Sequence, residues 1–315
     1  MTATALTIDD SGESASPGRL AWRRFRTHRV ALASACALLG LLLLVLVGPA
    51  VSAHDPDALS DSQFAAPSGN HWFGTDDHGR DLLTRVLHGA RVSLLVGIVG
   101  AGVSLVIGVL WGAVAGYVGG RVDEMLMRIV DILYSLPSIV FVIVLITTLE
   151  VLFKNWLAGI GSPALAAASR LLLLFIGLGA VSWLTMARIV RGQVLSLRRK
   201  AFIEAEHALG ISHTRILLCH ILPNVTGIVI VYLALTIPSI ILYESFLSYL
   251  GLGIQPPQAS LGSLIAAGAG QINPIRIYWW MIVFPASFLG LTLLALNFFG
   301  DGLRDALDPR SESGT

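Results

Sequence analysis

Residues 200–224 read KAFIEAEHALGISHTRILLCHILPN and join two long apolar segments. Within this stretch, Phe202, Ala205 and Leu209 follow one another at i, i+3 and i+7. That spacing places the three apolar side chains on one face of a helix, whereas Glu204 points elsewhere. The stretch therefore predicts a short amphipathic helix between the two apolar segments.

Both ends of this helix are marked in the sequence. Gly210 can adopt the left-handed conformation that ends an α-helix. Pro223 suits the first turn of a helix, where its missing N–H is not needed. We therefore expect the short helix to end at Gly210 and the chain to restart at Pro223 into the next apolar segment.

The composition excludes an ordinary soluble domain. Hydrophobic residues make up 55% of the chain and charged residues only 13%, about half the charged share of a soluble domain. The short apolar run 261–272 predicts a re-entrant or interfacial segment. We expect an all-α polytopic membrane protein, because six apolar stretches are long enough to cross a hydrocarbon core about 30 Å thick. These stretches are 30–51, 92–118, 129–150, 170–190, 221–243 and 279–299.

The distribution of basic residues predicts the orientation, because positively charged loops stay in the cytoplasm. With the N-terminus inside, fifteen of the 21 Lys and Arg residues lie on the cytoplasmic side, together with residues 200–216 and both termini. The fifteen are Arg19, Arg23, Arg24, Arg26, Arg29, Arg121, Arg128, Arg188, Arg191, Arg198, Arg199, Lys200, Arg215, Arg304 and Arg310.

The spans divide the chain into predicted parts. Residues 1–29 form a cytoplasmic tail, and its first 18 residues are expected to be disordered because they have little apolar content. The first span, 30–51, is long for the apolar region of a cleaved signal, so cleavage is not expected. An extracytoplasmic segment (52–91), a transmembrane domain (92–299) and a cytoplasmic tail (300–315) follow.

The spans contain few ionisable residues. Asp131, Glu150 and Glu244 lie near the ends of spans, whereas ion-coupled carriers normally use charged groups near mid-membrane. No Gly-Lys dipeptide is present in the sequence, so the phosphate-binding GxxxxGK[ST] loop is absent. Energy for transport would therefore come from a separate nucleotide-binding polypeptide.

Catalytic and metal-binding motifs are also missing from the sequence. Neither a GxSxG nucleophile elbow nor an HExxH zinc pair occurs, which disfavours an intramembrane enzyme. Four histidines with irregular spacing are interpreted as solvated or capping residues, so no metal site is predicted. They are His54, His71, His78 and His88.

Small residues recur at every fourth position along the second span. This stripe allows two helix backbones to approach closely in lipid. It indicates either a packing seam within the bundle or a helix face along the translocation pathway or a partner subunit. The residues are Gly100, Ser104, Gly108, Gly112, Gly116 and Gly120.

The segment 200–224 resembles the EAA loop of ABC importer permeases, with its Glu-Ala-Ala, Gly and Leu-Pro pattern. Glu206 departs from that pattern, which has Ala there, and His220 departs from the general Ile. The resemblance implies a coupling helix, at about 200–216, that sits in a groove of a cytoplasmic ATPase. The implied coupling residues are Phe202, Glu204, Ala205, Leu209, Gly210, Arg215, Leu222 and Pro223.

Three further segments resemble the dipeptide and oligopeptide branch of that family: 71–94 (HWFGTDDHGRDLLTRVLHGARVSL), 244–257 and 297–310. In the first, Asp81 and Arg85 are spaced as an i, i+4 ion pair. Two interpretations of this segment stay open: contact with the peptide, or a local ion and capping network that braces the next span. The candidate members of that network are Asp76, Arg80 and Asp81.

The resemblance implies a type I ABC importer permease fold and the second of two membrane subunits in a bacterial inner-membrane complex. Its implied partners are a homologous permease, two ABC ATPase subunits or domains that bind ATP and Mg, and an extracytoplasmic binding protein. No cofactor of its own and no nucleic acid are implied. The implied cargo is a dipeptide or short peptide. Nickel chelates or haem remain open as alternatives, as does an ATP-independent channel or carrier.

Overall fold

The computed structural model of the protein describes residues 17–52, 54–159, 169–256, 258–273 and 275–307, and every regular element there is a helix. The expected disorder of residues 1–18 falls outside these ranges, apart from the first two residues of α1. The helices are α1 (Pro17–Thr27), α2 (Arg29–Val51), α3 (Leu82–Val118), α4 (Gly120–Tyr134), α5 (Ser138–Gly159), α7 (Ser169–Arg198), α8 (Ala201–Ala208), α9 (His213–Arg215), the π-helix η1 (Ile216–Ile221), α10 (Leu222–Tyr249), α11 (Leu261–Gly270) and α12 (Trp280–Leu307).

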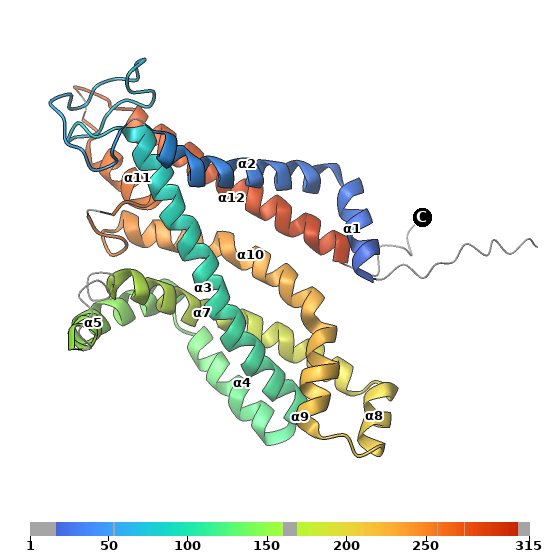
Figure 1. The fold of residues 1–315 in the computed structure, drawn as a ribbon. Helices are drawn as coiled ribbons and strands as arrows, with labels where there is room; N and C mark the ends of the chain where they lie inside the picture. Colours follow the sequence, from blue (N-terminus) through green and yellow to red (C-terminus); the bar gives the residue numbers. More distant parts are fainter. Residues whose placement is uncertain (1–16, 53, 160–168, 257, 274, 308–315) are drawn as a thin grey trace, which may run out of the picture.

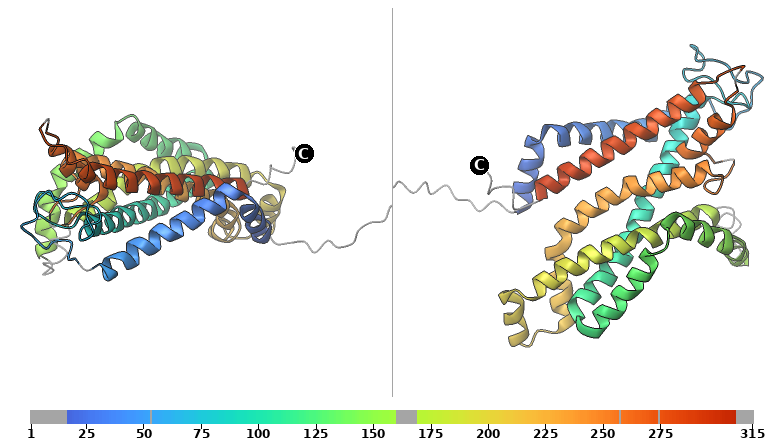
Figure 2. Two further views of the ribbon diagram at one scale, coloured as in Figure 1. Left: turned by 90° about the horizontal axis from the view of Figure 1, so that it is seen from above. Right: turned by 180° about the vertical axis from the view of Figure 1, so that it is seen from behind.

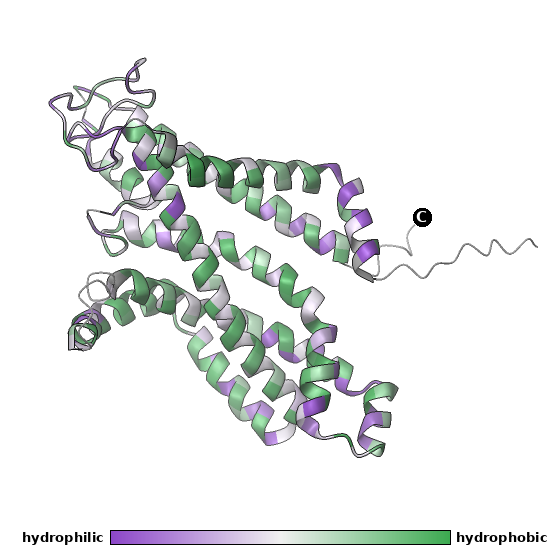
Figure 3. Cartoon of the chain, viewed as in Figure 1, coloured by the Kyte–Doolittle hydropathy of each residue, from purple (hydrophilic) through white to green (hydrophobic). Residues whose placement is uncertain are grey.

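Six helical stretches in the described ranges are long and apolar enough to cross a membrane. They correspond to α2, α3, α5, α7, α12 and the continuous run from α9 through η1 to α10. Figure 3 shows hydrophobic residues along these helices and hydrophilic residues gathered at α1, at α8 and in the loop before α3. The predicted all-α fold with six spans is therefore confirmed.

The packing order of the helices differs from their order in the sequence. α2 lies against α12, α12 against α10, α10 against α3, and α3 against α7. Figure 1 shows α3 crossing the other helices diagonally, with α5 beside α7. This arrangement brings the first and last spans together and leaves α2 at the edge of the bundle.

The two ends of the bundle have different structures. The loop before α3 and helix α11 lie at one end, and α1, α8 and the end of α12 lie at the other, as Figures 1 and 2 both show. At that second end, Phe25 of α1 packs on Phe299 and Ala306 of α12. The short amphipathic helix α8 therefore lies on the same side as the first and last described helices.

The third span differs from the prediction of a continuous helix over 129–150, because it begins only at Ser138. The helical chain breaks at Ser135, Leu136 and Pro137, because proline lacks an N–H and disfavours the helical conformation of the residue before it. Residues 120–134 form the separate amphipathic helix α4, which buries Asp123, while the span itself is Ser138–Gly159. A proline signal for this boundary is present in the sequence.

Small residues of α3 form a seam against α7. A Cβ added to Gly108 would lie 2.6 Å from Cβ of Met186, and one added to Gly116 would lie 2.8 Å from the carbonyl oxygen of Arg191. Both distances are below ordinary van der Waals contact, so only glycine allows this approach. The interpretation of the stripe as a packing seam is confirmed at these two positions.

Candidate functional site

Helix α8 leaves the bundle through a sharp reversal after α7. The backbone N–H of Lys200 donates to the carbonyl of Leu197 at 3.0 Å, and Lys200 itself is extended, so it separates the two helices. The following eight residues, Ala201–Ala208, form one short helix. The amphipathic helix predicted between residues 200 and 216 is thus present, although its regular part is shorter.

The two faces of α8 have different roles in the fold. Ile203 is fully buried and packs in a cluster that includes Ile216 and Ile221 of η1. By contrast, Phe202 is 43% exposed and Leu209 is 80% exposed. An apolar surface that the chain leaves uncovered at a helix face is typical of a docking site.

Other predicted coupling residues also lie at the surface. Ala205 is exposed beside Phe202, and Glu204 is exposed on the same short helix. Arg215 is exposed on α9, Leu222 is half-buried at the start of α10, and Pro223 is exposed next to it. We define Phe202, Glu204, Ala205 and Leu209 as the α8 surface.

The predicted left-handed conformation at Gly210 is confirmed, since its φ is +76°. The N–H of Gly210 donates to the carbonyl of His207 at 3.0 Å, and the N–H of Ile211 donates to the carbonyl of Glu206 at 3.2 Å. These two bonds satisfy carbonyl groups at the end of α8. Gly210 therefore turns the chain from α8 back toward the bundle.

The chain stays helical through Pro223, which corrects the expectation that it restarts there. Residues 216–221 form a π-helix, and the N–H of Leu222 donates to the carbonyl of Leu217, five residues earlier. The amide of Asn224 donates to the carbonyl of His220 at 2.6 Å. Since proline cannot donate to the preceding turn, the wider π turn accommodates it, and such turns are frequent at functional sites.

Glu206 and His220 form a direct contact between α8 and η1. The Nδ1 atom of His220 lies 2.7 Å from Oε1 of Glu206, whose side chain is 15% exposed. These two residues are the same two that depart from the general EAA pattern. Each departure is visible in the sequence by itself, but only the fold shows that Glu206 and His220 are paired.

An aromatic cluster connects α8 and α9 to the end of α3. The hydroxyl of Tyr117 and Nδ1 of His213 are 2.9 Å apart. The ring of His207 stacks on Tyr117 and lies 5.1 Å from the ring of His213, measured between centroids. The sequence alone does not predict this cluster, because nothing local places Tyr117 near residues that follow it by about ninety positions.

Charged residues line a cavity of about 630 Å³ beside the α8 surface. Glu204 lies on its wall together with Arg198 and Arg199. The guanidinium of Arg191 is held by a two-point ion pair to Asp123 of α4, with Nη2 at 2.6 Å from Oδ2. The cavity therefore has a basic side to which an acidic or hydrogen-bonding partner group is suited.

The opposite end of the bundle contains the predicted ion and capping network. Asp76, only 4% exposed, accepts from Nε of Arg80 at 2.7 Å and lies 3.4 Å from Nη1 of Arg85. Asp81 caps α3 by accepting from the N–H of Thr84 at 2.9 Å. The predicted ion and capping network is present, but the expected Asp81–Arg85 pair is wrong, because Arg85 pairs with Asp76.

Comparison with known families agrees with this architecture. Residues 108–313 match the family described as binding-protein-dependent transport system inner membrane component. The chain belongs to this family. Residues 16–67 of the permease also match the N-terminal transmembrane domain of oligopeptide transport permease C. The permease is thus a multi-pass membrane protein of a transport system.

Curated relatives extend over almost the whole permease. It is 45% identical over 300 residues to the oligopeptide transport system permease protein OppC of Haemophilus influenzae, covering 93% of this chain and 90% of that one. The corresponding OppC of Escherichia coli is 46% identical, with 93% and 92% covered. The dipeptide transport system permease protein DppC of Bacillus subtilis is 42% identical over 291 residues, with 92% and 85% covered.

The fold also resembles that of a solved transporter. The permease matches a chain of the MetNI methionine ABC transporter, in inward-facing conformations, with a TM-score of 0.52 and 20% identity. The match covers 71% of the permease and 96% of that chain. At this identity the likeness concerns the fold alone, and it confirms the type I ABC importer permease architecture.

Proposed function

We propose that this permease is one of two membrane subunits of an ATP-driven importer of dipeptides or short peptides. Its partners are a homologous permease, two cytoplasmic ABC ATPase subunits or domains, and an extracytoplasmic binding protein that delivers the peptide. ATP and Mg²⁺ bind to the ATPases, and the permease itself has no cofactor. The complex lies in a bacterial inner membrane, with both termini and α8 of the permease in the cytoplasm.

The single observation that carries this proposal is the uncovered α8 surface. Phe202 and Leu209 are apolar and exposed at the end of the bundle, where lipid cannot cover them if α8 is cytoplasmic. Burying this apolar surface against an ATPase would stabilise the complex, by up to about 1.5–3 kcal/mol for the more fully exposed Leu209. The basic asymmetry of the sequence independently supports a cytoplasmic α8.

The contacts of α8 suggest how its movement reaches the spans. Ile203 anchors it to the cluster at η1, Glu206 contacts His220, and the Tyr117–His213 bond connects the following turn to α3. When ATP draws the ATPases together, α8 moves with them and the bundle opens outward to take the peptide. Such coupling requires that ATP bind the two conformations with different affinities.

Co-purification from native membranes tests the docking surface. We expect a tagged permease to retain an ABC ATPase, and Phe202→Asp or Leu209→Asp to release it. Ile275→Asp is the matched control, because Ile275 is also apolar and 88% exposed but lies between α11 and α12. Equal ATPase retention by the unmodified permease and the three variants would contradict the proposed docking site.

Uptake assays test the cargo and the energy source. Cells that lack the gene should regain uptake of labelled dipeptide or tetrapeptide when the permease is restored, and only while ATP is available. Uptake of a nickel chelate or haem without peptide uptake would assign the alternative cargo. Peptide uptake that persists without ATP would instead indicate a channel or carrier.

A further inference from the structure

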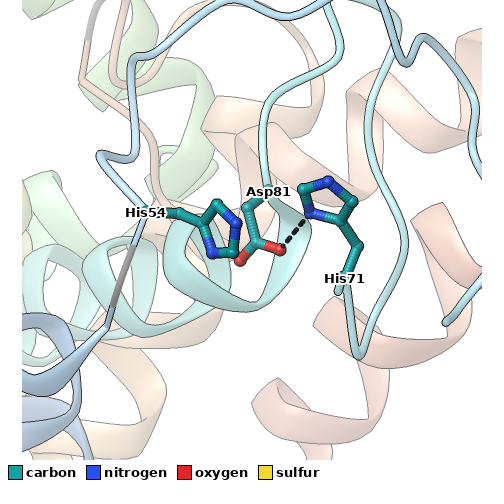
Figure 4. A group of neighbouring side chains, drawn as sticks. All are labelled: His54, His71 and Asp81. Atoms are coloured by element: carbon teal, nitrogen blue, oxygen red, sulfur yellow. Dashed lines mark hydrogen bonds and ion pairs between the residues drawn. The ribbon is translucent and has the colours of Figure 1, made fainter. Parts of the chain in front are cut away.

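Two imidazoles and one carboxylate from three separate segments meet at the start of α3 (Figure 4). His71 Nδ1 lies 3.0 Å from Oδ1 of Asp81, and the ring centroids of His54 and His71 are 4.9 Å apart. One ligand atom from each of the three residues lies within 4.8 Å of the other two. We propose that His54, His71 and Asp81 bind a divalent first-row metal ion of the Zn²⁺ type.

The residue types and their spacing fit this class of ion. Zinc binds imidazole nitrogen and carboxylate oxygen at about 2.0–2.2 Å in a tetrahedral arrangement, which separates the ligand atoms by roughly 3.3–3.5 Å. The His71–Asp81 separation of 3.0 Å is already close to one edge of that tetrahedron. His54 is exposed and follows the end of α2, so its ring can close the remaining distance. A water molecule would complete the coordination.

Asp81 is oriented for this role by the groups around it. Its side chain is only 4% exposed. Its Oδ2 atom accepts from both the N–H and the hydroxyl of Thr84, at 2.9 and 2.8 Å, which leaves Oδ1 directed at His71. The Thr84 hydroxyl is in turn 2.7 Å from Oγ of Ser52. Such outer contacts fix the direction of a metal ligand and raise affinity.

The backbone around His71 is also held in place. Its carbonyl accepts from the N–H of Ser68 at 2.8 Å and from the N–H of Gly74 at 2.9 Å. The imidazole therefore projects from a closed turn toward Asp81. Two of the three ligands are thus fixed before any ion arrives, which lowers the entropy cost of binding.

A second group of potential ligands nearby is already occupied by other partners. Asp76 accepts from Arg80 and contacts Arg85, and its Oδ1 also accepts from the N–H groups of His78 and Arg80 at 2.9 Å. A cation beside Asp76 would have to displace two guanidinium groups. The geometry therefore favours metal binding at the cluster of His54, His71 and Asp81. His78 belongs to the occupied group, so it is a suitable control.

An ion at this cluster would join the end of α2, the loop and the start of α3. The end of α2 and the start of α3 are otherwise connected by the Ser52–Thr84 contact and by helix packing. A ligand that binds only the folded state stabilises it in proportion to the logarithm of its concentration. We therefore expect added Zn²⁺ to raise the unfolding temperature of the permease by several degrees.

The test is calorimetric titration of the full-length permease, purified in detergent without a polyhistidine tag and stripped of metal by a chelator. We expect one Zn²⁺ ion per chain, and Co²⁺ should give the intense visible absorption of a four-coordinate site. His54→Ala and His71→Ala should weaken binding at least tenfold. His78→Ala and His88→Ala are the controls and should bind like the unmodified permease.

His54→Ala decides the outcome if His71→Ala fails to fold. In the described part of the chain, the His54 ring contacts the His71 ring and makes no hydrogen bond, so its loss should leave the metal-free unfolding temperature unchanged. The proposal is overturned by the absence of stoichiometric Zn²⁺ binding, or by equal binding in His54→Ala. Neither result would bear on ATPase docking, because that surface lies at the other end of the bundle.

Discussion

Glu206 of α8 and His220 of η1 lie side by side, with 2.7 Å between Oε1 and Nδ1. The contact joins the short exposed helix to the π-helix that leads into α10. The other carboxylate oxygen of Glu206, Oε2, is buried without a hydrogen-bond partner in the described residues. The pair therefore acts within the permease, whereas the carboxylate of Glu204, two residues earlier, is exposed and free to meet a partner.

Glu204→Ala should weaken ATPase binding more than Glu206→Ala. Removing one member of an interface charge pair can cost about 2–5 kcal/mol when the other charge is left buried, and we expect the exposed Glu204 to meet a basic or hydrogen-bond donor group of the ATPase. Glu206→Ala should retain the ATPase but lower peptide-stimulated ATP hydrolysis, because the contact to His220 is lost. ATPase co-purification at matched permease levels is the measurement. Release of the ATPase by Glu206→Ala alone would show that the EAA alignment is wrong.

Gly210→Ala should reduce uptake without releasing the ATPase. Gly210 has φ +76°, where a Cβ costs about 1–2 kcal/mol, while no atom within 4 Å would clash with that Cβ. The substitution therefore strains the backbone of the turn after α8 and causes no steric clash with other residues. Gly192→Ala is the matched control, since Gly192 is in the interior of α7 with the same open space, and it should have normal uptake. If both variants transport alike, the turn has no coupling role.

Gly108→Leu should destabilise the permease, because the new side chain would meet Met186 and the carbonyl of Trp183. Overpacking of this kind costs about 1–3 kcal/mol. Gly102→Leu should be nearly neutral, since the space beside Gly102 is open. Unfolding temperatures in detergent compare the two, and equal temperatures would argue against the seam between α3 and α7.

Asp76→Ala should destabilise the end of the permease around the loop before α3 by about 3–5 kcal/mol, because it leaves buried Arg85 without its partner. Asp77→Ala is the control. Asp77 is more exposed and contacts Arg80 at 3.8 Å, so its loss should change stability by less than about 1 kcal/mol. Protease resistance of the loop before α3 reports the difference, and equal resistance would contradict the proposed brace.

The proposed orientation predicts which introduced cysteines an impermeant thiol reagent reaches in intact cells. Ile275 and His207 are both exposed, so once Cys36 and Cys219 are replaced, labelling in intact cells reports the side of the membrane on which each position lies. Ile275→Cys should be labelled from outside, whereas His207→Cys should be labelled only after permeabilisation. Labelling of His207→Cys in intact cells would reverse the topology.

Local sequence signals were sufficient for much of the fold. Six spans follow from apolar length, because a segment that crosses the bilayer must satisfy its own backbone as a helix. The turn at Gly210 follows from the conformational freedom of glycine. The predicted third span begins too early even though Pro137 marks its true start, because apolar residues at the end of α4, such as Ile132 and Leu133, lie just before Pro137 and extend the apolar run.

The sequence by itself determined the fold class, the short helix at residues 201–208 and the resemblance to importer permeases. The tertiary structure alone decided which side chains meet across distance. It pairs Arg85 with Asp76, places Tyr117 against His213 and brings His54 to Asp81. The physical reason is that apolar length and turn conformation depend on neighbouring residues, whereas these contacts depend on how helices and loops far apart in the chain pack together.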